Sequence, residues 1–188
     1  AVSGLGLDAK GNLSATGIDA SPAYTGTIAV QPFDLRRLLV QLNQKVPVTA
    51  DPNVLKLVAA SAQFQGAKDA IDFKQLAVSL DQTNASGNLK IVNFASPEYL
   101  FSLGIDGINA DRYLAPKIKT PPGVPQPPQA TTQLPIERLR KLKLQGNLSI
   151  GNLVYSGARM NDVKLTVNSR GGKFALDPAA ARLYQGGF

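Results

Sequence analysis

The chain contains no cysteine, no histidine and no tryptophan, and it has only one methionine. The first two absences exclude thiol nucleophiles, disulfides, zinc sites of the usual kind and imidazole acid–base catalysis. Aromatic residues make up only 6% of the chain. No run of about 18 apolar residues occurs in the sequence, so it offers no candidate for a membrane-spanning helix. A cysteine-free chain is compatible with an oxidising compartment such as the periplasm.

What the chain does contain is a recurring five-residue phrase, in which a glycine precedes two apolar residues at alternate positions. Each copy is typical of a turn glycine followed by a β-strand with one apolar face. Three copies begin 61 and 59 residues apart, which indicates an elongated β-structure built from similar units rather than a compact enzyme around one pocket. The five copies are Gly11–Ala15, Gly26–Val30, Gly87–Ile91, Gly146–Ile150 and Gly172–Leu176.

Helices are expected in only a few places. Asp34 is placed to cap a helix near residues 34–43, whose leucines fall on one stripe. The pair Asp51-Pro52 favours a second helix near 52–58, because proline suits the first helical position. From residue 60 onward, apolar residues alternate with small or polar ones, which is typical of antiparallel strands with one buried face.

These patterns predict a mainly β fold: a curved, elongated antiparallel sheet, U-shaped or groove-like, with two or three short helices packed at its side or end. Residues 1–114 are expected to form a β-rich groove unit with a hairpin turn at Asp8–Gly11. Residues 115–135 are rich in proline and are expected to form an exposed loop. Residues 136–188, opening on a helical turn at Pro135–Leu139, continue the same sheet. We interpret the chain as one structural domain truncated at both ends.

Charge and polar motifs point to no catalytic site. Residues 1–116 carry a net charge of −1 and residues 117–188 a net charge of +8. The basic third fits anionic lipid headgroups, nucleic acid or merely the solvated face of strands. Because the basic run at 138–143 has leucines rather than aromatics beside it, nucleic acid is not an expected partner. The carboxylate pairs Asp69/Asp72 and Asp106/Asp111 are typical of turns. We therefore expect no enzyme, no metal and no cofactor.

The alternating apolar residues leave two hypotheses open. One is a groove whose apolar lining, without fixed polar anchors, binds lipid acyl chains. The other is a structural or interaction module with a closed core, assisting the assembly of outer-membrane proteins or lipopolysaccharide through its edge strands. The groove hypothesis assigns the lining to Leu76, Val78, Leu80, Leu89, Ile91, Phe101, Leu103, Ile105, Leu148, Ile150, Leu165 and Val167.

The order of several soft motifs resembles the AsmA family, and the resemblance covers nearly the whole chain. The family phrase at Ile105–Leu114 usually carries an acidic residue where this chain has Asn109. The other segments that carry the resemblance are Pro32–Leu39, Ala50–Pro52, Gly87–Leu89, Leu142–Leu148, Asp162–Leu165, Leu176–Pro178 and Leu183–Gly187.

The resemblance implies an envelope protein of Gram-negative bacteria with a periplasmic β-rich body and an inner-membrane anchor upstream of Ala1. The family's larger TamB-like relatives are similar to bridge-like lipid-transfer proteins, which have a U-shaped β-groove. By resemblance, the expected function is to bind or conduct phospholipid along an apolar groove in support of outer-membrane lipid homeostasis. The expected partners are acyl chains, the inner membrane, and proteins of the periplasm or outer membrane.

Overall fold

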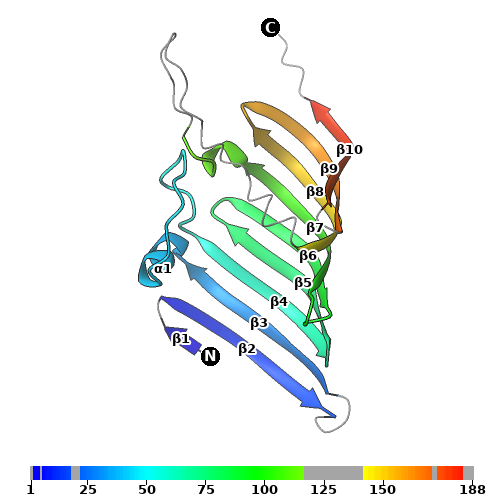
Figure 1. The fold of residues 1–188 in the computed structure, drawn as a ribbon. Coiled ribbons are helices and arrows are strands. Elements are labelled where there is room, and N and C mark those ends of the chain that lie inside the picture. Colours follow the sequence, from blue (N-terminus) through cyan, green and yellow to red (C-terminus); the bar gives the residue numbers. More distant parts are fainter. Residues whose placement is uncertain (1, 5, 18–21, 117–141, 171–172, 184–188) are drawn as a thin grey trace, which may run out of the picture.

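A curved, open β-sheet of ten strands dominates the computed structural model, which describes residues 2–4, 6–17, 22–116, 142–170 and 173–183 (Figure 1). The strands follow one another across the sheet in chain order, with β1 and β10 at its two edges. Their bounds are β1 (Val2–Gly4), β2 (Leu7–Thr16), β3 (Ala23–Phe33), β4 (Val58–Ala67), β5 (Ala70–Leu80), β6 (Thr83–Val92), β7 (Glu98–Asn109), β8 (Lys143–Tyr155), β9 (Ala158–Arg170) and β10 (Lys173–Leu183). The expectation of a mainly β, curved and elongated sheet is therefore confirmed.

All neighbouring strands are antiparallel except β7 and β8, which are parallel. In this pair Glu98 lies opposite Lys143 and Asn109 opposite Val154, so both strands start at the same end of the sheet. The segment 136–188 was expected to continue the sheet, and β8, β9 and β10 do so. The proline-rich loop and the helical turn at Pro135–Leu139 lie outside the described residues, apart from Ala115 and Pro116.

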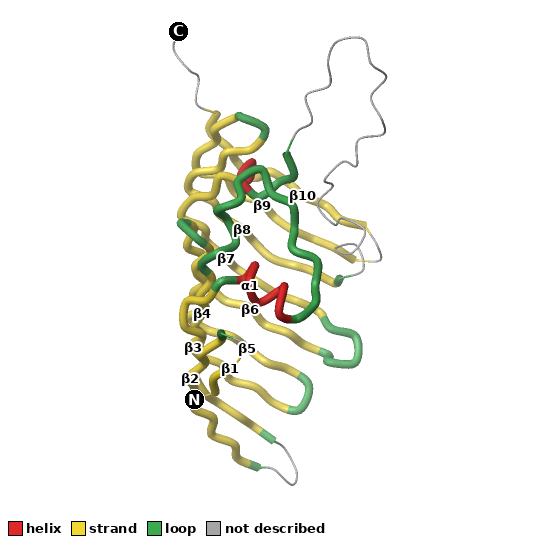
Figure 2. The backbone as a smooth tube through the Cα atoms, turned by 90° about the vertical axis from the view of Figure 1, so that its left-hand side faces the viewer, coloured by secondary structure: helices red, strands yellow, loops and turns green. Residues whose placement is uncertain are grey.

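Helical structure in the described residues is confined to one end of the strands (Figures 1 and 2). Helix α1 (Leu35–Gln41) is capped by Asp34, whose carboxylate accepts the Arg37 N–H at 3.0 Å, as the sequence predicts. A 3-10 turn, η1 (Ala110–Arg112), follows β7 at the same end. None of the described helices is long and apolar enough to span a membrane.

The prediction of a second helix near 52–58 is wrong. Residues 51–56 form turns and bends, and Val58 already belongs to β4. Two local features explain the difference. The Asp51 carboxylate accepts the Asn53 N–H at 2.8 Å, which closes a turn, and Leu55 has a φ of 63°, which no right-handed helix contains. The hairpin turn expected at Asp8–Gly11 is also wrong, because β2 runs straight through these residues.

The sheet has little interior of its own. The described elements that touch most extensively are neighbours within the sheet, as expected for a single layer. The buried apolar residues among those described are Val54, Ala62, Ile150, Val163 and Val167. Stability therefore depends on cross-strand contacts on one face of the sheet rather than on a filled centre.

Four of the five repeated glycines, Gly11, Gly26, Gly87 and Gly146, lie inside strands, not in turns as the sequence suggested. The fifth, Gly172, lies outside the described residues. Gly146 is in the middle of β8, opposite Phe101 of β7. A Cβ added there would come within 2.1 Å of the Phe101 carbonyl oxygen and 2.7 Å of the ring carbon Cγ. Gly26 and Gly66 are covered in the same way by the rings of Phe64 and Tyr24. At Gly26 and Gly146 the missing side chain therefore leaves room for an aromatic ring of the neighbouring strand, whereas at Gly11 and Gly87 it leaves room for the neighbouring backbone.

Replacing Gly146 by alanine is expected to lower the free energy of unfolding by about 1–3 kcal/mol, because the backbone oxygen of Phe101 cannot move aside cheaply. The matched control is Gly104→Ala, where the nearest atom to an added Cβ, the Ser149 Oγ, lies at an ordinary 3.4 Å. Urea denaturation followed by circular dichroism measures both. Equal midpoints for the two variants would contradict the packing described above.

Candidate functional site

The strand register places all twelve predicted lining residues on one face of the sheet. Leu103 of β7 lies opposite Leu148 of β8, which in turn lies opposite Leu165 of β9. Because side chains of directly paired residues point to the same side, this row shares one face. The register pairs between neighbouring strands from β5 to β9 place the other predicted lining residues on this same face. We call this side the apolar face; it carries Leu76, Val78, Leu80, Leu89, Ile91, Phe101, Leu103, Ile105, Leu148, Ile150, Leu165 and Val167.

The apolar face extends further than the sequence predicted. A bulge in β5 is one reason, because two residues of β5 oppose a single residue of β4 and of β6 at this point. Gln75, with a φ of 50°, lies within this irregularity, so Phe73 and Leu76 share a face although they are three positions apart. Counting in steps of two therefore loses Phe73. The additional members on this face include Leu13, Tyr24, Ile28, Val30, Phe64, Ile71, Phe73, Tyr99, Leu144 and Val163.

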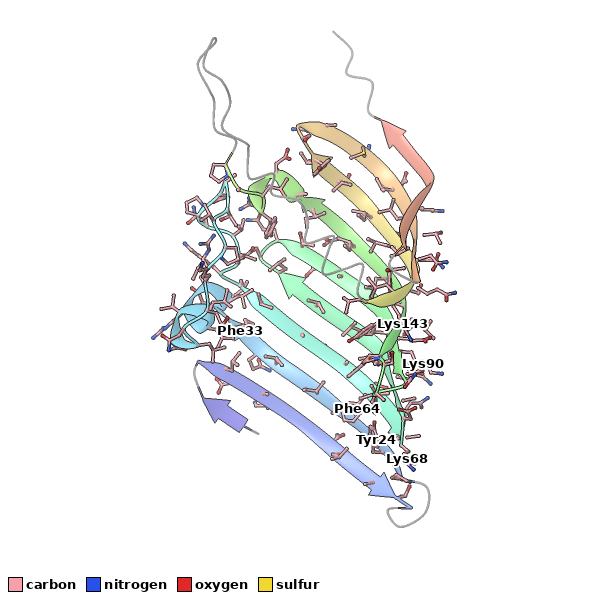
Figure 3. The ribbon with its side chains drawn as sticks, viewed as in Figure 1. Tyr24, Phe33, Phe64, Lys68, Lys90 and Lys143 are labelled. Carbon is pink, nitrogen blue, oxygen red and sulfur yellow. The ribbon has the colours of Figure 1, made fainter. Side chains whose placement is uncertain are left out.

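Three aromatic rings form a continuous row across β3, β4 and β5. The centroids of Tyr24 and Phe64 are 6.5 Å apart, and those of Phe64 and Phe73 are 6.2 Å apart. Figure 3 shows Tyr24 and Phe64 near one end of the strands, with Phe33 at the other end. Tilted contacts at this spacing stabilise aromatic pairs beyond simple burial. The row gives this part of the apolar face a broad aromatic surface.

Exposure of the apolar face changes along the sheet. On β2 and β3 its side chains are open to solvent, with Leu13 68% and Ile28 42% exposed. On β8 and β9 exposure is lower: Ile150 is 6% and Val163 4% exposed, whereas Leu148 and Leu165 are half-buried. The strands between have half-buried side chains such as Leu103. The exposed fraction of these apolar side chains thus falls from β2 toward β9, although leucines on β8 and β9 stay half-buried.

The opposite face is polar. Its positions on β7, β8 and β9 include Ser102, Asn147 and Thr166, which lie in register with one another and are exposed. Two shallow hollows of about 330 and 380 Å³ are lined mainly from this side. Their walls combine threonine and glutamine side chains with Lys74, Lys90 and Asp72. These hollows are too polar to belong to the predicted acyl-chain lining.

A network around Asp81 holds the segment after α1 against the sheet. The two carboxylate oxygens of Asp81 accept the N–H groups of Leu55, Lys56 and Leu57 at 2.8–3.1 Å, and the hydroxyl of Tyr113 at 3.0 Å. Although burial opposes its ionisation, these hydrogen bonds hold the pKa of Asp81 below its usual value. Burial, together with the bond to Asp81, raises the pKa of Tyr113 to about 12. Both groups therefore stay in one protonation state through the neutral range.

Two arginines extend this network. Arg112 donates to the Asp51 carboxylate at 2.8 Å and to the Gln82 side chain at 2.6 Å. The Asn53 N–H and the Arg112 side chain both lower the pKa of Asp51. Arg36 of α1 donates to the Val54 carbonyl at 2.7 Å and to the Thr49 hydroxyl. Val54 and Thr49 are consequently buried beneath the helix, and we call this arrangement of α1, residues 42–57 and η1 the capped end.

The candidate carboxylate pairs serve the backbone, as expected for turn residues. Asp106 accepts the N–H groups of Asn84 and Gly107, together with the Asn84 side-chain amide, and these bonds lower the pKa of Asp106. Asp111 accepts the two N–H groups of the β8–β9 turn, and Asp69 accepts the Phe94 N–H. Asp72 differs, because it lies within β5, 3.9 Å from the Lys74 ammonium. The described residues contain no cluster suited to a metal ion.

Comparisons of the chain with protein-family models, with curated proteins and with solved structures find no match. The site is therefore interpreted from its own geometry. That geometry offers one extensive feature, the apolar face, backed by a polar face and bounded by the capped end.

Proposed function

We propose that this chain binds the acyl chains of phospholipid along the apolar face. The observation that carries the proposal is the continuity of that face: from β3 to β8, no charged residue stands in register on it. Burying each methylene of a lipid tail contributes about 0.8 kcal/mol and demands no directional partner. A long surface of leucine, isoleucine, valine and phenylalanine, without fixed polar groups, matches that requirement.

The partial exposure of the face supports a bound lipid over a closed core. A sealed interior would bury its apolar side chains uniformly, whereas Leu13 and Ile28 are largely exposed and Leu103 is half-buried. Exposed apolar area of this extent is a typical feature of ligand or partner sites. The described helices do not offer a second layer, because α1 and η1 lie at the strand ends (Figure 2).

The cellular setting belongs to the same proposal. The resemblance to the AsmA family supports a periplasmic location, attachment to the inner membrane in the full-length protein, and a role in outer-membrane lipid homeostasis and assembly. The alternative, a structural or interaction module that assists assembly, is favoured by one observation. No described strand pairs with the outer edge of β2 at Lys10–Thr16, since β1 covers only Leu7, Asp8 and Ala9. That open edge is able to accept a further strand.

The decisive experiment compares two substitutions on neighbouring residues of β9. Leu165→Asp places a charge on the apolar face, whereas Thr166→Asp places the same charge on the polar face. Native mass spectrometry of the purified proteins is expected to detect phospholipid on the wild type and on Thr166→Asp. On Leu165→Asp the retained lipid is expected to fall about tenfold, because a carboxylate against hydrocarbon is poorly solvated.

Circular dichroism of both variants serves as the control for folding. Absence of lipid from the wild type, after expression in Gram-negative cells and gentle purification, would refute the proposal. Equal lipid on the two folded variants would refute the assignment to the apolar face.

A further inference from the structure

The strand end opposite the capped end carries exposed lysines from several strands. Lys68 lies in the β4–β5 turn, Lys90 lies close to the end of β6, and Lys143 is the first residue of β8. All three side chains are exposed, and they follow one margin of the sheet in Figure 3. We call this margin, with the turns that join β4 to β5 and β6 to β7, the basic end.

The nearby carboxylates neutralise this end only in part. Glu98 pairs with Lys143 at 3.2 Å, and Asp72 lies 3.9 Å from Lys74 rather than pairing with Lys90. The Asp69 carboxylate accepts the Phe94 N–H at 2.8 Å and is thus engaged with the backbone. Among the described residues, no carboxylate lies within ion-pair distance of Lys68 or Lys90. These two ammonium groups are free to bind an external anion.

Large apolar side chains are exposed beside the lysines. Phe94, in the β6–β7 turn, is 44% exposed, and Leu142, next to Lys143, is 38% exposed. The turn presents Phe94 in a fixed position. The Asn93 N–H donates to the Asp69 carbonyl at 2.9 Å, and the Ser96 N–H donates to the Asn93 carbonyl at 2.9 Å. Contact with water does not stabilise an exposed phenylalanine side chain, so transfer of Phe94 to an apolar environment is favourable.

We propose that the basic end docks onto the surface of a bilayer that contains anionic phospholipid. The negative surface potential of the bilayer attracts each lysine toward the lipid phosphates and so adds to the binding free energy. Phe94 and Leu142 enter the interface between headgroups and tails. The combination favours a bilayer over nucleic acid, because the aromatic row of Tyr24, Phe64 and Phe73 lies on the apolar face, away from Lys90 and Lys143. Phe94 alone offers no row of stacking platforms beside the lysines. It also favours a bilayer over a protein, because lysine with its flexible, strongly hydrated head suits a fluid array of phosphates.

The docking surface is separate from the apolar face, so the two proposals can fail independently. Lys90 and Lys143 lie in register with polar-face positions, and Phe94 lies in a turn beyond the end of β6. If both proposals hold, docking brings one margin of the apolar face to the bilayer. Lipid tails then have a short path from the membrane to the protein.

Co-sedimentation with vesicles tests the proposal. The vesicles consist of phosphatidylcholine alone or of phosphatidylcholine mixed with phosphatidylglycerol. Wild type is expected to bind the mixed vesicles and to bind the neutral ones only weakly. Added salt is expected to weaken binding to the mixed vesicles progressively. A triple variant is expected to bind the mixed vesicles at least about tenfold more weakly, since each lysine contributes roughly fivefold and Lys143 less. Its substitutions are Lys68→Gln, Lys90→Gln and Lys143→Gln.

The matched control removes the same charge elsewhere. Its substitutions, Lys10→Gln, Lys45→Gln and Lys164→Gln, lie away from the basic end and are expected to change binding by less than about twofold. Phe94→Ser, which keeps all charges, is expected to weaken binding to mixed vesicles by about tenfold. Equal loss in the two triple variants, or full binding by the first of them, would overturn the proposal. Retained phospholipid in native mass spectra, despite failed docking, would leave the proposed function standing.

Discussion

Ile150→Asp is expected to prevent the domain from folding. Ile150 is 6% exposed and lies between Ile105 of β7 and Val163 of β9 on the apolar face. An unpaired carboxylate in this position loses its hydration and removes a branched side chain from cross-strand packing. Together these losses amount to about 4–5 kcal/mol, which is a large fraction of the stability of most domains. Circular dichroism and thermal melting of the purified variant measure the effect.

The informative contrast is with Leu103→Asp, one strand away on the same face. Leu103 is half-buried, so its carboxylate keeps much of its hydration, and we expect a folded protein that melts only moderately earlier. Ser149→Asp, next to Ile150 but on the polar face, is expected to leave melting nearly unchanged. If Leu103→Asp unfolds the domain as completely as Ile150→Asp does, the face is a closed core. In that case the alternative module becomes the better interpretation.

Asp81→Asn is expected to release the capped end. Asparagine fits the backbone at this position, where φ is 53°, and has nearly the same shape. Its NH2 group, however, replaces one of the two carboxylate oxygens. Two donors then face either the Leu55 N–H and the Tyr113 hydroxyl, or the N–H groups of Lys56 and Leu57, while the other pair keeps an uncharged acceptor. We expect a loss of about 2–3 kcal/mol in the free energy of unfolding, since hydrogen bonds to a charged acceptor are the strong ones.

The same carboxylate gives this variant a distinctive pH profile. The folded protein holds the pKa of Asp81 below the unfolded value of roughly 3.9. Its contribution to stability is therefore fully present above that value and disappears as the pH falls through the lower, folded pKa. The difference in stability between wild type and Asp81→Asn should narrow as the pH drops below about 4. Urea melts at neutral and acidic pH measure it, and a constant difference would show that the charge contributes nothing.

Alternation along the strands was the part of the structure that the sequence predicted best. Tyr99, Phe101, Leu103 and Ile105 share a face, because a strand with one apolar side and one polar side leaves its period in the sequence. The Asp34 cap of α1 was readable for a similar reason, since it acts over three residues. Both signals are local.

The errors come from interactions between distant residues. Residues 52–58 were expected to be helical, but the carboxylate of Asp81, some 25 residues later, binds their N–H groups instead. The described glycines of the repeated phrase were assigned to turns, although they lie in strands and leave room for the adjacent backbone or, at Gly26 and Gly146, for an aromatic ring. The β5 bulge hid Phe73 from a count in steps of two. None of these partners is adjacent in the sequence, so no local pattern announces them.

The single parallel pair has a consequence for how the chain assembles. Within β4–β7, each strand meets its predecessor across a short turn, so these contacts can form by successive local steps. Strand β8 does not follow its predecessor β7 across a short turn. It pairs with β7 only after the long connection between Asn109 and Lys143 has closed, and closing this loop costs conformational entropy. The formation of the sheet up to β7 is therefore expected to be separate from the addition of β8. We expect the last three strands to add as a separate piece, with the pairing of β7 and β8 as the slow step of folding.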